Sequence, residues 1–354
     1  MEKLKLAIIG AGGIATHAHA PSYENMDNVD VVCVCDIIAE RAEKLAERLG
    51  AEKWCTDYKE ALDIRGLDAV DICTPNYLHS IIAVEALDRG INVVCEKPDA
   101  INAAEAEKMK IAAEKSGKVL MVIRNNRFMA VSSYLKKYIE DGRMGEIYSA
   151  RCGWQRRRGI PGKGGWFTTK EQSGGGPLID LGVHMIDLSM WLMGNPKPVA
   201  VSGCTYEKFA NTEVADSVHS KFGDVKDDGI FDVEDLAMGF IRFENGACMQ
   251  IEFSWASNIE AEQRFFELRG TRSGAAWTSL DNKLKIFGEE YGNTVDHIPN
   301  VADKCQQHEA NLRHFADVVL NGEAPMFVPQ QGFDMIKILE GFYKSAEEGR
   351  EILL

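Results

Sequence analysis

The sequence predicts an α/β protein in two parts: a doubly wound parallel sheet at the N-terminus and a C-terminal α+β domain with a large, mostly antiparallel open sheet. Two observations carry this prediction. In the first third of the chain, short β-rich runs alternate with amphipathic helical stretches, a pattern typical of parallel strands joined by crossover helices. After Arg124, β-rich runs follow one another with few helices between them, which favours antiparallel pairing. We therefore expect one domain over residues 1–124 and a second over residues 125–354.

Length and composition exclude several classes of protein. At ~150 residues per domain, 354 residues suffice for two domains, and 45% hydrophobic with 27% charged residues is typical of a globular chain. The net charge of −14 repels a phosphate backbone, so we expect no nucleic-acid partner. No run reaches the ~18 apolar residues that span a bilayer, so we expect no membrane partner. Nine cysteines, several of them inside apolar runs, fit a reducing cytoplasm.

The elements of the first domain follow from β-rich runs and helical periodicity. Strands are predicted at Leu4–Gly10, Val29–Cys35, Ala69–Cys73, Asn92–Cys95 and Lys118–Ile123. Helices are predicted at 38–49 and 80–89, and each ends at a glycine, Gly50 or Gly90. The first of these helices places apolar residues on one face and charges on the other, as expected for a helix that covers a sheet.

The second domain begins with a helix at 132–141 and continues with successive strands. Strands are predicted at 146–154, 198–206, 236–243, 247–255, 263–269, 274–279 and 283–287. Asn245-Gly246 is the strongest short hairpin signal among the connections. Further helices are predicted at 177–192, 305–320 and 334–347.

A glycine-rich turn follows the first strand. Gly10-Ala11-Gly12-Gly13-Ile14-Ala15 stands between a predicted strand and a helix, where backbone N–H groups approach a pyrophosphate. Asp36 ends the second strand, at the distance in sequence where a carboxylate accepts hydrogen bonds from both hydroxyls of an adenine ribose. A 2'-phosphate would be repelled there, so the sequence favours NAD over NADP unless Arg41 approaches to change the preference.

Two short motifs follow later strands of the same predicted sheet. Thr74-Pro75-Asn76 and Glu96-Lys97-Pro98 both stand at the carboxyl edge of the strands, where open α/β sheets bind ligands. Pro98 biases Lys97 towards an extended conformation, which directs its long side chain at the crevice. We expect both motifs to face the nicotinamide.

Together with a downstream motif, these segments resemble the Gfo/Idh/MocA oxidoreductases over essentially the whole chain. The downstream motif is Gly174-Gly175-Gly176-Pro-Leu-Ile-Asp180-Leu-Gly182-Val-His184-Met-Ile-Asp187, and His79 follows Asn76 at the matching place. The resemblance implies a Rossmann domain that binds NAD(P), a second domain that offers its sheet to substrate and partner subunits, and sugars, glycosides or cyclitols as substrates. It also implies a catalytic group of Lys97, Asp180 and His184, a cis Lys97–Pro98 bond and a substrate contact at Asn126.

The expected cofactor-binding residues come from the turn, the strand ends and the two motifs. They are Gly10, Gly12, Gly13, Ile14, Asp36, Arg41, Thr74, Pro75, Asn76, His79, Glu96 and Lys97.

The downstream motif also makes chemical sense by itself. Asp180 and His184 are one helical turn apart and share a face. Oxidation of a secondary alcohol needs a base with a pKa near the working pH, and histidine at ~6.5 needs less tuning than lysine at ~10.4. We therefore expect His184 to act as the base, Lys97 to hydrogen-bond the substrate oxygen and Asp180 to orient the hydroxyl or His184.

Weaker signals leave alternatives open. Arg151, Arg156, Arg157 and Arg158 with Trp154 and Trp166 suit a sugar-binding face, although a subunit contact or a solvated charge run fits them nearly as well. His17-x-His19 resembles a zinc-binding pair of hydrolases. The glycine turn directly before this pair and the absence of a second histidine cluster favour a loop that lines the nicotinamide pocket, so we expect no metal.

Three functions therefore compete. The leading one is an NAD-dependent dehydrogenase that acts as a homo-oligomer, a dimer or tetramer formed through the C-terminal sheet. The second is a catalytically silent NAD-binding regulator of the same fold, against which the intact Lys97, Asp180 and His184 argue. The third is a zinc-dependent hydrolase.

Overall fold

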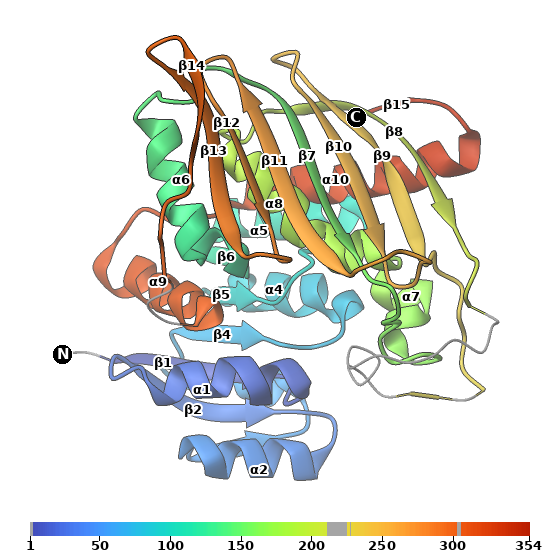
Figure 1. The fold of residues 1–354 in the computed structure, drawn as a ribbon. Helices are drawn as coiled ribbons and strands as arrows, with labels where there is room; N and C mark the ends of the chain where they lie inside the picture. The colour runs from blue at the N-terminus through green and yellow to red at the C-terminus, as the bar shows by residue number, and fades with distance from the viewer. Residues whose placement is uncertain (1–2, 211–224, 227, 303–305) are drawn as a thin grey trace. The chain divides into compact units, whose positions relative to one another are not determined.

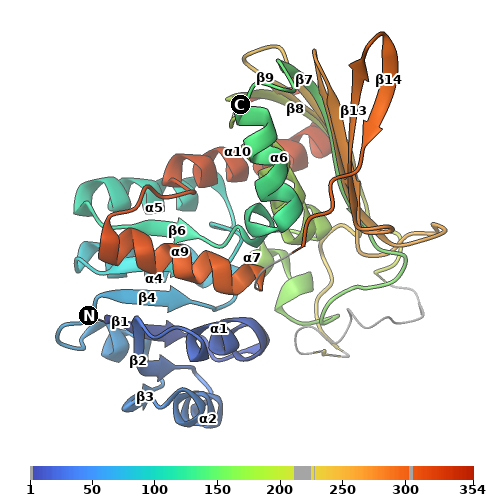
Figure 2. The ribbon, with the colours of Figure 1, turned by 60° about the vertical axis from the view of Figure 1, so that its left-hand side comes forward.

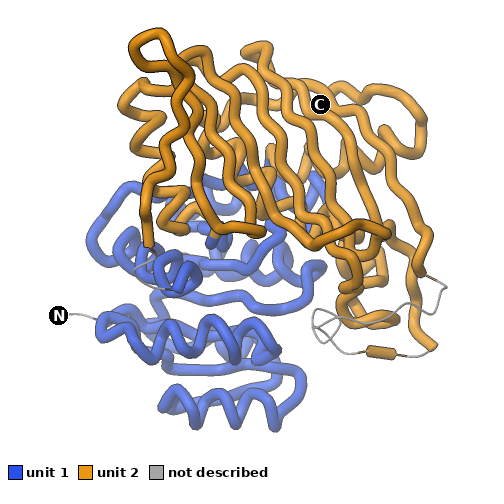
Figure 3. Tube along the Cα trace, viewed as in Figure 1, with its two compact units in different colours: residues 1–125, 305–333 blue, residues 126–304, 334–354 orange. Residues whose placement is uncertain are grey.

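The computed structural model describes residues 3–210, 225–226, 228–302 and 306–354. The chain forms two compact units, each drawn from two stretches of sequence (Figure 3). Unit 1 comprises Met1–Asn125 and Cys305–Phe333, and unit 2 comprises Asn126–Lys304 and Asp334–Leu354. The stretch 305–333 follows most of the strands of unit 2 in sequence but belongs to unit 1.

Unit 1 is built on a six-stranded parallel sheet with the order β3-β2-β1-β4-β5-β6 (Figure 1). Its strands are β1 (Leu4–Ile9), β2 (Val29–Cys35), β3 (Lys53–Cys55), β4 (Ala69–Ile72), β5 (Asn92–Cys95) and β6 (Leu120–Val122). The predicted doubly wound parallel sheet is confirmed. The order reverses between β1 and β4, so the carboxyl ends of these strands form the crevice where such sheets bind ligands. The sequence missed β3, which has three residues and exposes the first two.

Helices cover this sheet. They are α1 (Ala20–Glu24), α2 (Ala39–Leu49), α3 (Tyr58–Leu62), α4 (His79–Asp88), α5 (Ala103–Ser116) and α9 (Gln307–Asn321), with the 3-10 helix η2 (Asn76–Leu78) and the π-helix η1 (Ala15–His19). As expected, α2 ends at Gly50, whose φ of 69° is left-handed. Helix α9 packs on α1, η1 and β5. It begins at Gln307, and residue 305 of the predicted helix lies outside the described residues.

Unit 2 is built on a nine-stranded sheet with the order β14-β13-β12-β11-β7-β10-β9-β8-β15 (Figure 1). Its strands are β7 (Ile147–Gln155), β8 (Pro198–Tyr206), β9 (Leu236–Phe243), β10 (Cys248–Ser254), β11 (Gln263–Gly270), β12 (Gly274–Thr278), β13 (Lys283–Glu290), β14 (Asn293–His297) and β15 (Ile352–Leu353). β7 and β10 run parallel, and the other strand pairs within the described residues are antiparallel, which confirms the predicted sheet. Gly246, with a φ of 86°, turns the β9–β10 hairpin.

One face of this sheet is covered by helices, and Figure 2 shows α6 and α10 along it. The helical segments are η3 (Asn125–Phe128), α6 (Ala130–Glu140), η4 (Trp166–Thr168), α7 (Lys170–Ser173), the π-helix η5 (Leu178–Gly182), α8 (Val183–Leu192) and α10 (Pro329–Glu348). Phe253, Phe266 and Trp277 of this sheet are buried. The single helix predicted at 177–192 is instead a π-helix followed by an α-helix. Across the described residues, no helix is long and apolar enough to cross a membrane.

Candidate active site

The glycine turn of unit 1 has the geometry that a dinucleotide requires. Gly10 has a φ of 101°, and a Cβ atom there would lie 2.6 Å from the carbonyl oxygen of Cys73, so only glycine fits. A Cβ atom on Gly12 or Gly13 would meet no described atom within 4 Å, so the backbone there is open to a ligand. The Asp36 carboxylate accepts hydrogen bonds from the N–H groups of Ala11 (2.7 Å) and Ile38 (2.8 Å), which fixes it beside the turn.

The two motifs at the sheet edge are joined by a buried histidine. The ring of His79 lies between the carbonyl oxygens of Thr74 (2.9 Å, Nε2) and Pro98 (2.7 Å, Nδ1). Burial lowers the pKa of His79. The Lys97–Pro98 bond is cis, as the family resemblance implies. The buried hydroxyl oxygen of Thr74 has no hydrogen-bond partner among the described residues, so the edge keeps a polar group available to a ligand.

The His17-x-His19 segment differs from the expected loop. It lies in the π-helix η1, where His17 is exposed and His19 is fully buried. Nδ1 of His19 lies 2.7 Å from the Asp71 carboxylate, and Nε2 lies 2.9 Å from that of Glu96. The two histidines therefore point to different surroundings, and carboxylates of the chain face both nitrogens of His19.

In unit 2, a buried carboxylate holds the start of the segment that carries Asp180. Glu234 accepts hydrogen bonds from the backbone N–H groups of Gly176 (2.9 Å) and Leu178 (3.0 Å) and from the hydroxyl of Tyr343 (3.1 Å). A Cβ atom on Gly176 would lie 2.0 Å from the carbonyl oxygen of Glu234, which explains why this approach needs glycine. Burial raises the pKa of Glu234 to about 7, although the N–H donors oppose the rise.

Asp180 and His184 each contact a tryptophan from the sheet. Asp180 lies in η5, and one of its carboxylate oxygens accepts a 2.9 Å hydrogen bond from the indole N–H of Trp255, which is fully buried. His184 lies in α8, and its ring centroid is 5.9 Å from that of Trp154 on β7, with the rings tilted by 49°. A π-turn inside an α-helix is frequent at functional sites. The helix and the sheet thus fix both candidate residues.

Two arginines surround Trp154. Arg156 and Arg264 place their guanidinium carbons 5.1 and 4.9 Å from the ring centroid of Trp154. Arg264 stands directly opposite Trp154 in the β11–β7 pairing. Burial lowers the pKa of Arg156, and the nearby Asp180 carboxylate opposes that change. Nε of Arg156 and Nε1 of Trp154 are buried and have no hydrogen-bond partner within the described part of the chain. Buried hydrogen-bond donors without a partner can be satisfied by an acceptor atom of a ligand.

The remaining predicted substrate residues lie in unit 2 as well. The buried Asn126 donates from Nδ2 to the sulfur of Met185 on α8 (3.6 Å). Trp166 stacks on its neighbour Phe167 at 3.8 Å, a contact that does not bring it to Asp180 or His184. Lys97, the remaining member of the catalytic group expected from the sequence, belongs to unit 1.

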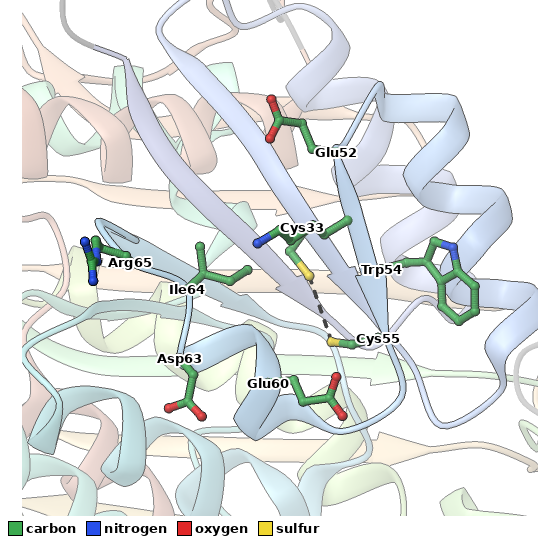
Figure 4. A pocket seen from close by; sticks show the side chains of 9 residues that line it. Cys33, Glu52, Trp54, Cys55, Glu60, Asp63, Ile64 and Arg65 are labelled. Atoms are coloured by element: carbon green, nitrogen blue, oxygen red, sulfur yellow. Dashed lines mark hydrogen bonds between the residues drawn. The ribbon is translucent and has the colours of Figure 1, made fainter.

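A separate cavity of about 500 Å³ lies at the β3 edge of the unit 1 sheet (Figure 4). Its lining residues are Cys33, Glu52, Lys53, Trp54, Cys55, Glu60, Asp63, Ile64 and Arg65. The thiols of Cys33 and Cys55 meet there at 3.9 Å, and burial raises the pKa of Cys33 to about 12. None of the predicted site residues lines this cavity.

Comparison with known proteins decides the family. Residues 4–124 match an oxidoreductase family with an NAD-binding Rossmann fold, and residues 136–354 match the C-terminal alpha/beta domain of the same family. The chain belongs to the Gfo/Idh/MocA oxidoreductases. The resemblance, the fold class and the assignment as an oxidoreductase are therefore confirmed.

Relatives of this oxidoreductase act on sugars and cyclitols. The chain is 32% identical to D-glucoside 3-dehydrogenase of Escherichia coli (strain K12), over 99% of this chain and 97% of that protein. It is 28% identical to scyllo-inositol 2-dehydrogenase (NAD(+)) of Bacillus subtilis (strain 168), over 92% of this chain and 88% of that protein. The structure of levoglucosan dehydrogenase in complex with NADH and levoglucosan has the same fold, with a TM-score of 0.87, 24% identity and coverage of 100% and 99% of the two chains.

Sequence reasoning missed several residues of this oxidoreductase's candidate site. Trp255 and Arg264 carry no motif, and their closeness to Asp180 and Trp154 follows only from strand pairing. Glu234 carries no motif either, and its hydrogen bonds to Gly176 and Leu178 follow only from the fold.

Proposed function

We propose that the protein is an NAD-dependent dehydrogenase that transfers hydride between a secondary hydroxyl of a sugar, glycoside or cyclitol and nicotinamide. One observation carries this proposal most strongly: Asp180 is held by the Trp255 indole, and His184 follows on the next turn against Trp154. A carboxylate and an imidazole fixed on one helical segment suit proton transfer at a hydroxyl. The NAD-binding Rossmann family to which residues 4–124 belong supports the hydride acceptor.

The residues present fit NAD. We assign Gly10, Gly12, Gly13 and Ile14 to the pyrophosphate, where open backbone and a helix start favour an anion. Asp36 would accept hydrogen bonds from the ribose hydroxyls and repel a 2'-phosphate, so NAD is preferred over NADP unless Arg41 approaches to change the preference. Thr74, Pro75, Asn76 and Lys97 would face the nicotinamide half, and His79 and Glu96 would act by holding the loops that carry them. When bound, the nicotinamide supplies the site that takes up or returns hydride.

Residues of the chain itself would carry out the proton transfer. We assign His184 as the base that takes the hydroxyl proton and Lys97 as the donor of a hydrogen bond to the substrate oxygen. Asp180 would orient the hydroxyl or His184, and the Trp255 indole fixes its rotamer. Without the indole N–H, the Asp180 carboxylate would lose the hydrogen bond that fixes its orientation.

The substrate class follows from the polar and aromatic lining and from the relatives. Trp154, Trp166 and Asn126 are the proposed contacts with a sugar or cyclitol ring, together with the unpaired donors of Arg156 and Trp154. Hydroxyl oxygens of such a ring are suitable acceptors for these donors. The relatives named for glucosides and inositol support this class without choosing between them.

The two sequence ranges would divide the work. We propose that 1–124 binds NAD(P) and that 125–354 binds substrate and forms a homo-oligomer, a dimer or tetramer. The uncovered face of the nine-stranded sheet supports the oligomer, since it presents Phe240 and Phe287 in a half-exposed setting. The described cysteines are free thiols, in keeping with a reducing cytoplasm.

A substrate screen tests this function. Purified protein is incubated with NAD⁺ or NADP⁺ and a panel of methyl glycosides, levoglucosan and inositols, and the absorbance of reduced nicotinamide is followed. We expect turnover with at least one ring alcohol and a preference for NAD⁺ that Asp36→Asn weakens. Tight NAD⁺ binding without turnover on any panel member would instead favour the silent regulator. One equivalent of zinc in the purified protein would favour the zinc-dependent hydrolase.

A further inference from the structure

His19 lies at the centre of a buried cluster of charged side chains in unit 1. It ends the π-helix η1 directly after the glycine turn, and its side chain has no exposed surface. Asp71 comes from β4, and Glu96 follows β5, so two neighbouring strands of the sheet bring the carboxylates together. The carboxylates of Asp71 and Glu96 contact opposite nitrogens of the ring at 2.7 and 2.9 Å.

The hydrogen-bond geometry and the two carboxylate charges together favour a charged ring. Ionised carboxylates only accept hydrogen bonds, and a neutral imidazole has only one N–H, so two such contacts need a ring protonated on both nitrogens. Each carboxylate also accepts a hydrogen bond from a second donor. The Tyr23 hydroxyl donates to Asp71 (2.8 Å), and the backbone N–H of Lys97 donates to Glu96 (3.0 Å).

The remaining titratable neighbours agree with an imidazolium. Burial alone would lower the pKa of His19, but the charge and hydrogen bond of Asp71 raise it well above its usual value. Burial raises the pKa of the Cys73 thiol to about 12, which keeps it neutral. His308 of α9 lies 3.9 Å from Glu96, and burial lowers its pKa, so it adds no competing cation.

We propose that His19 is a permanently protonated positioning residue that holds Glu96, and through Glu96 the main chain of Lys97, against the helix that follows the glycine turn. One oxygen of Glu96 binds the His19 ring and the other binds the N–H of Lys97. His19 thus ties the cofactor-binding turn to the lysine loop without touching a ligand. Its role in turnover rests on the proposed function of Lys97, whereas its charge does not.

The first test measures the charge directly in the unmodified protein. The protein is labelled with ¹⁵N-histidine, and the ring nitrogens of its eight histidines are followed by NMR from pH 6 to pH 9. We expect one histidine to keep the signature of two protonated nitrogens at pH 8.5, after ordinary exposed histidines have lost a proton. Absence of any imidazolium at pH 8.5 would overturn the proposal. So would an equivalent of bound zinc whose removal by chelation changes the same signal.

A conservative variant tests the positioning role. Asp71→Asn keeps an acceptor oxygen but removes one charge, so His19 should become neutral within the measured range. We then expect kcat to fall about tenfold as pH rises past the new pKa of His19, with KM for NAD⁺ changed less than threefold. His297→Asn, which alters an exposed histidine on β14, is the matched control and should leave kcat and KM within twofold.

The outcomes separate this inference from the proposed function. An Asp71→Asn enzyme with the wild-type pH profile would refute the positioning role even where the NMR result holds. A protein with the imidazolium signal but no activity on any ring alcohol would refute the dehydrogenase and leave the charge of His19 established.

Discussion

Each unit contains a polar cluster that begins in a π-helix, buried in unit 1 and partly buried in unit 2, and the two clusters are completed in opposite ways. In unit 1, His19 is bonded on both ring nitrogens, and the Tyr23 hydroxyl and the Lys97 backbone N–H also donate to its carboxylate partners, Asp71 and Glu96. In unit 2, Asp180 accepts from Trp255, but Nε of Arg156 and Nε1 of Trp154 have no partner among the described residues. The hydrogen bonds of the first cluster are made within the chain, whereas the second cluster keeps two donors that a ligand can use.

This difference indicates which cluster holds the fold and which receives a ligand. A fully bonded buried network makes the structure around it rigid. A buried donor without an acceptor costs about 1–3 kcal/mol, and a binding site recovers that cost when the ligand arrives. Changes in the unit 1 cluster should therefore act on stability first, and changes in the unit 2 cluster on substrate affinity and turnover.

The largest effect on stability is expected from His19→Gln. This change leaves two buried carboxylates without their shared cation, and breaking a buried ion pair in this way costs about 3–5 kcal/mol. Urea unfolding followed by circular dichroism measures the loss. His17→Gln, on the exposed side of the same π-helix, should change the free energy of unfolding by less than ~0.5 kcal/mol. Equal losses of unfolding free energy in His19→Gln and His17→Gln would contradict a stabilising role for the buried cluster of unit 1.

Trp255→Phe should act on catalysis. It removes a hydrogen bond to the Asp180 carboxylate, and a bond to a charged group is worth about 1.5–3 kcal/mol, so kcat should fall roughly 10–100-fold. Steady-state kinetics with the best panel substrate measures this. Trp277→Phe is the matched control, because its indole donates to Asn282 elsewhere in the same sheet, and it should keep kcat within threefold. Similar losses of kcat in both variants would mean that the effect is general.

Glu234→Gln should change how stability depends on pH. Burial raises the folded-state pKa to about 7 from 4.5, so the native state keeps a proton that the unfolded state has lost. The contribution of Glu234 is therefore complete below pH 4.5 and declines as pH rises through 7, by up to about 3 kcal/mol. The Tm of the wild type should fall more between pH 5 and pH 8 than that of the variant. Exposed Glu244→Gln is the control, and parallel Tm curves for Glu234→Gln and wild type would refute the shift.

Arg156→Gln should have the smallest effect on stability. The guanidinium is buried with its Nε donor unpaired and its Nη1 bonded to the carbonyl oxygen of Gly159, so its removal should change the free energy of unfolding by only about 1 kcal/mol. KM for the ring alcohol should rise about tenfold, because the substrate loses a donor. Exposed Arg242→Gln, whose partner is Glu351, should leave KM unchanged. A loss of stability without a rise in KM would reverse the roles of the two clusters.

The sequence predicted the regular parts of the fold well, because alternation and helix stops are local signals. Strands β2, β5, β8 and β9 begin and end at the predicted residues. β3 and β14 were missed because β3 has three residues and β14 is largely exposed, so neither shows a buried face. Nothing in a local pattern distinguishes a π-turn from an α-turn, and both π-helices were therefore unforeseen.

The sequence predicted only those residues of the candidate site that lie in recognisable motifs. Lys97, Asp180 and His184 stand in motifs, whereas Trp255 reaches Asp180 only because η5 packs on β10. His308 illustrates the same limit, since α9 returns to unit 1 from beyond the second sheet. Contacts between residues far apart in sequence depend on topology, and one sequence shows topology only by analogy.

The most direct test of the central claim is the kcat of Lys97→Met and His184→Asn with NAD⁺ and the ring alcohol that the wild type oxidises best. NAD⁺ affinity, measured by quenching of intrinsic fluorescence, confirms that each variant still binds the cofactor. We expect affinity within a few-fold of wild type and a kcat that is lower by roughly 10²–10⁴-fold, the usual contribution of a positioned acid or base. Near-normal kcat in both variants would contradict the assignment of Lys97 and His184 to the chemistry.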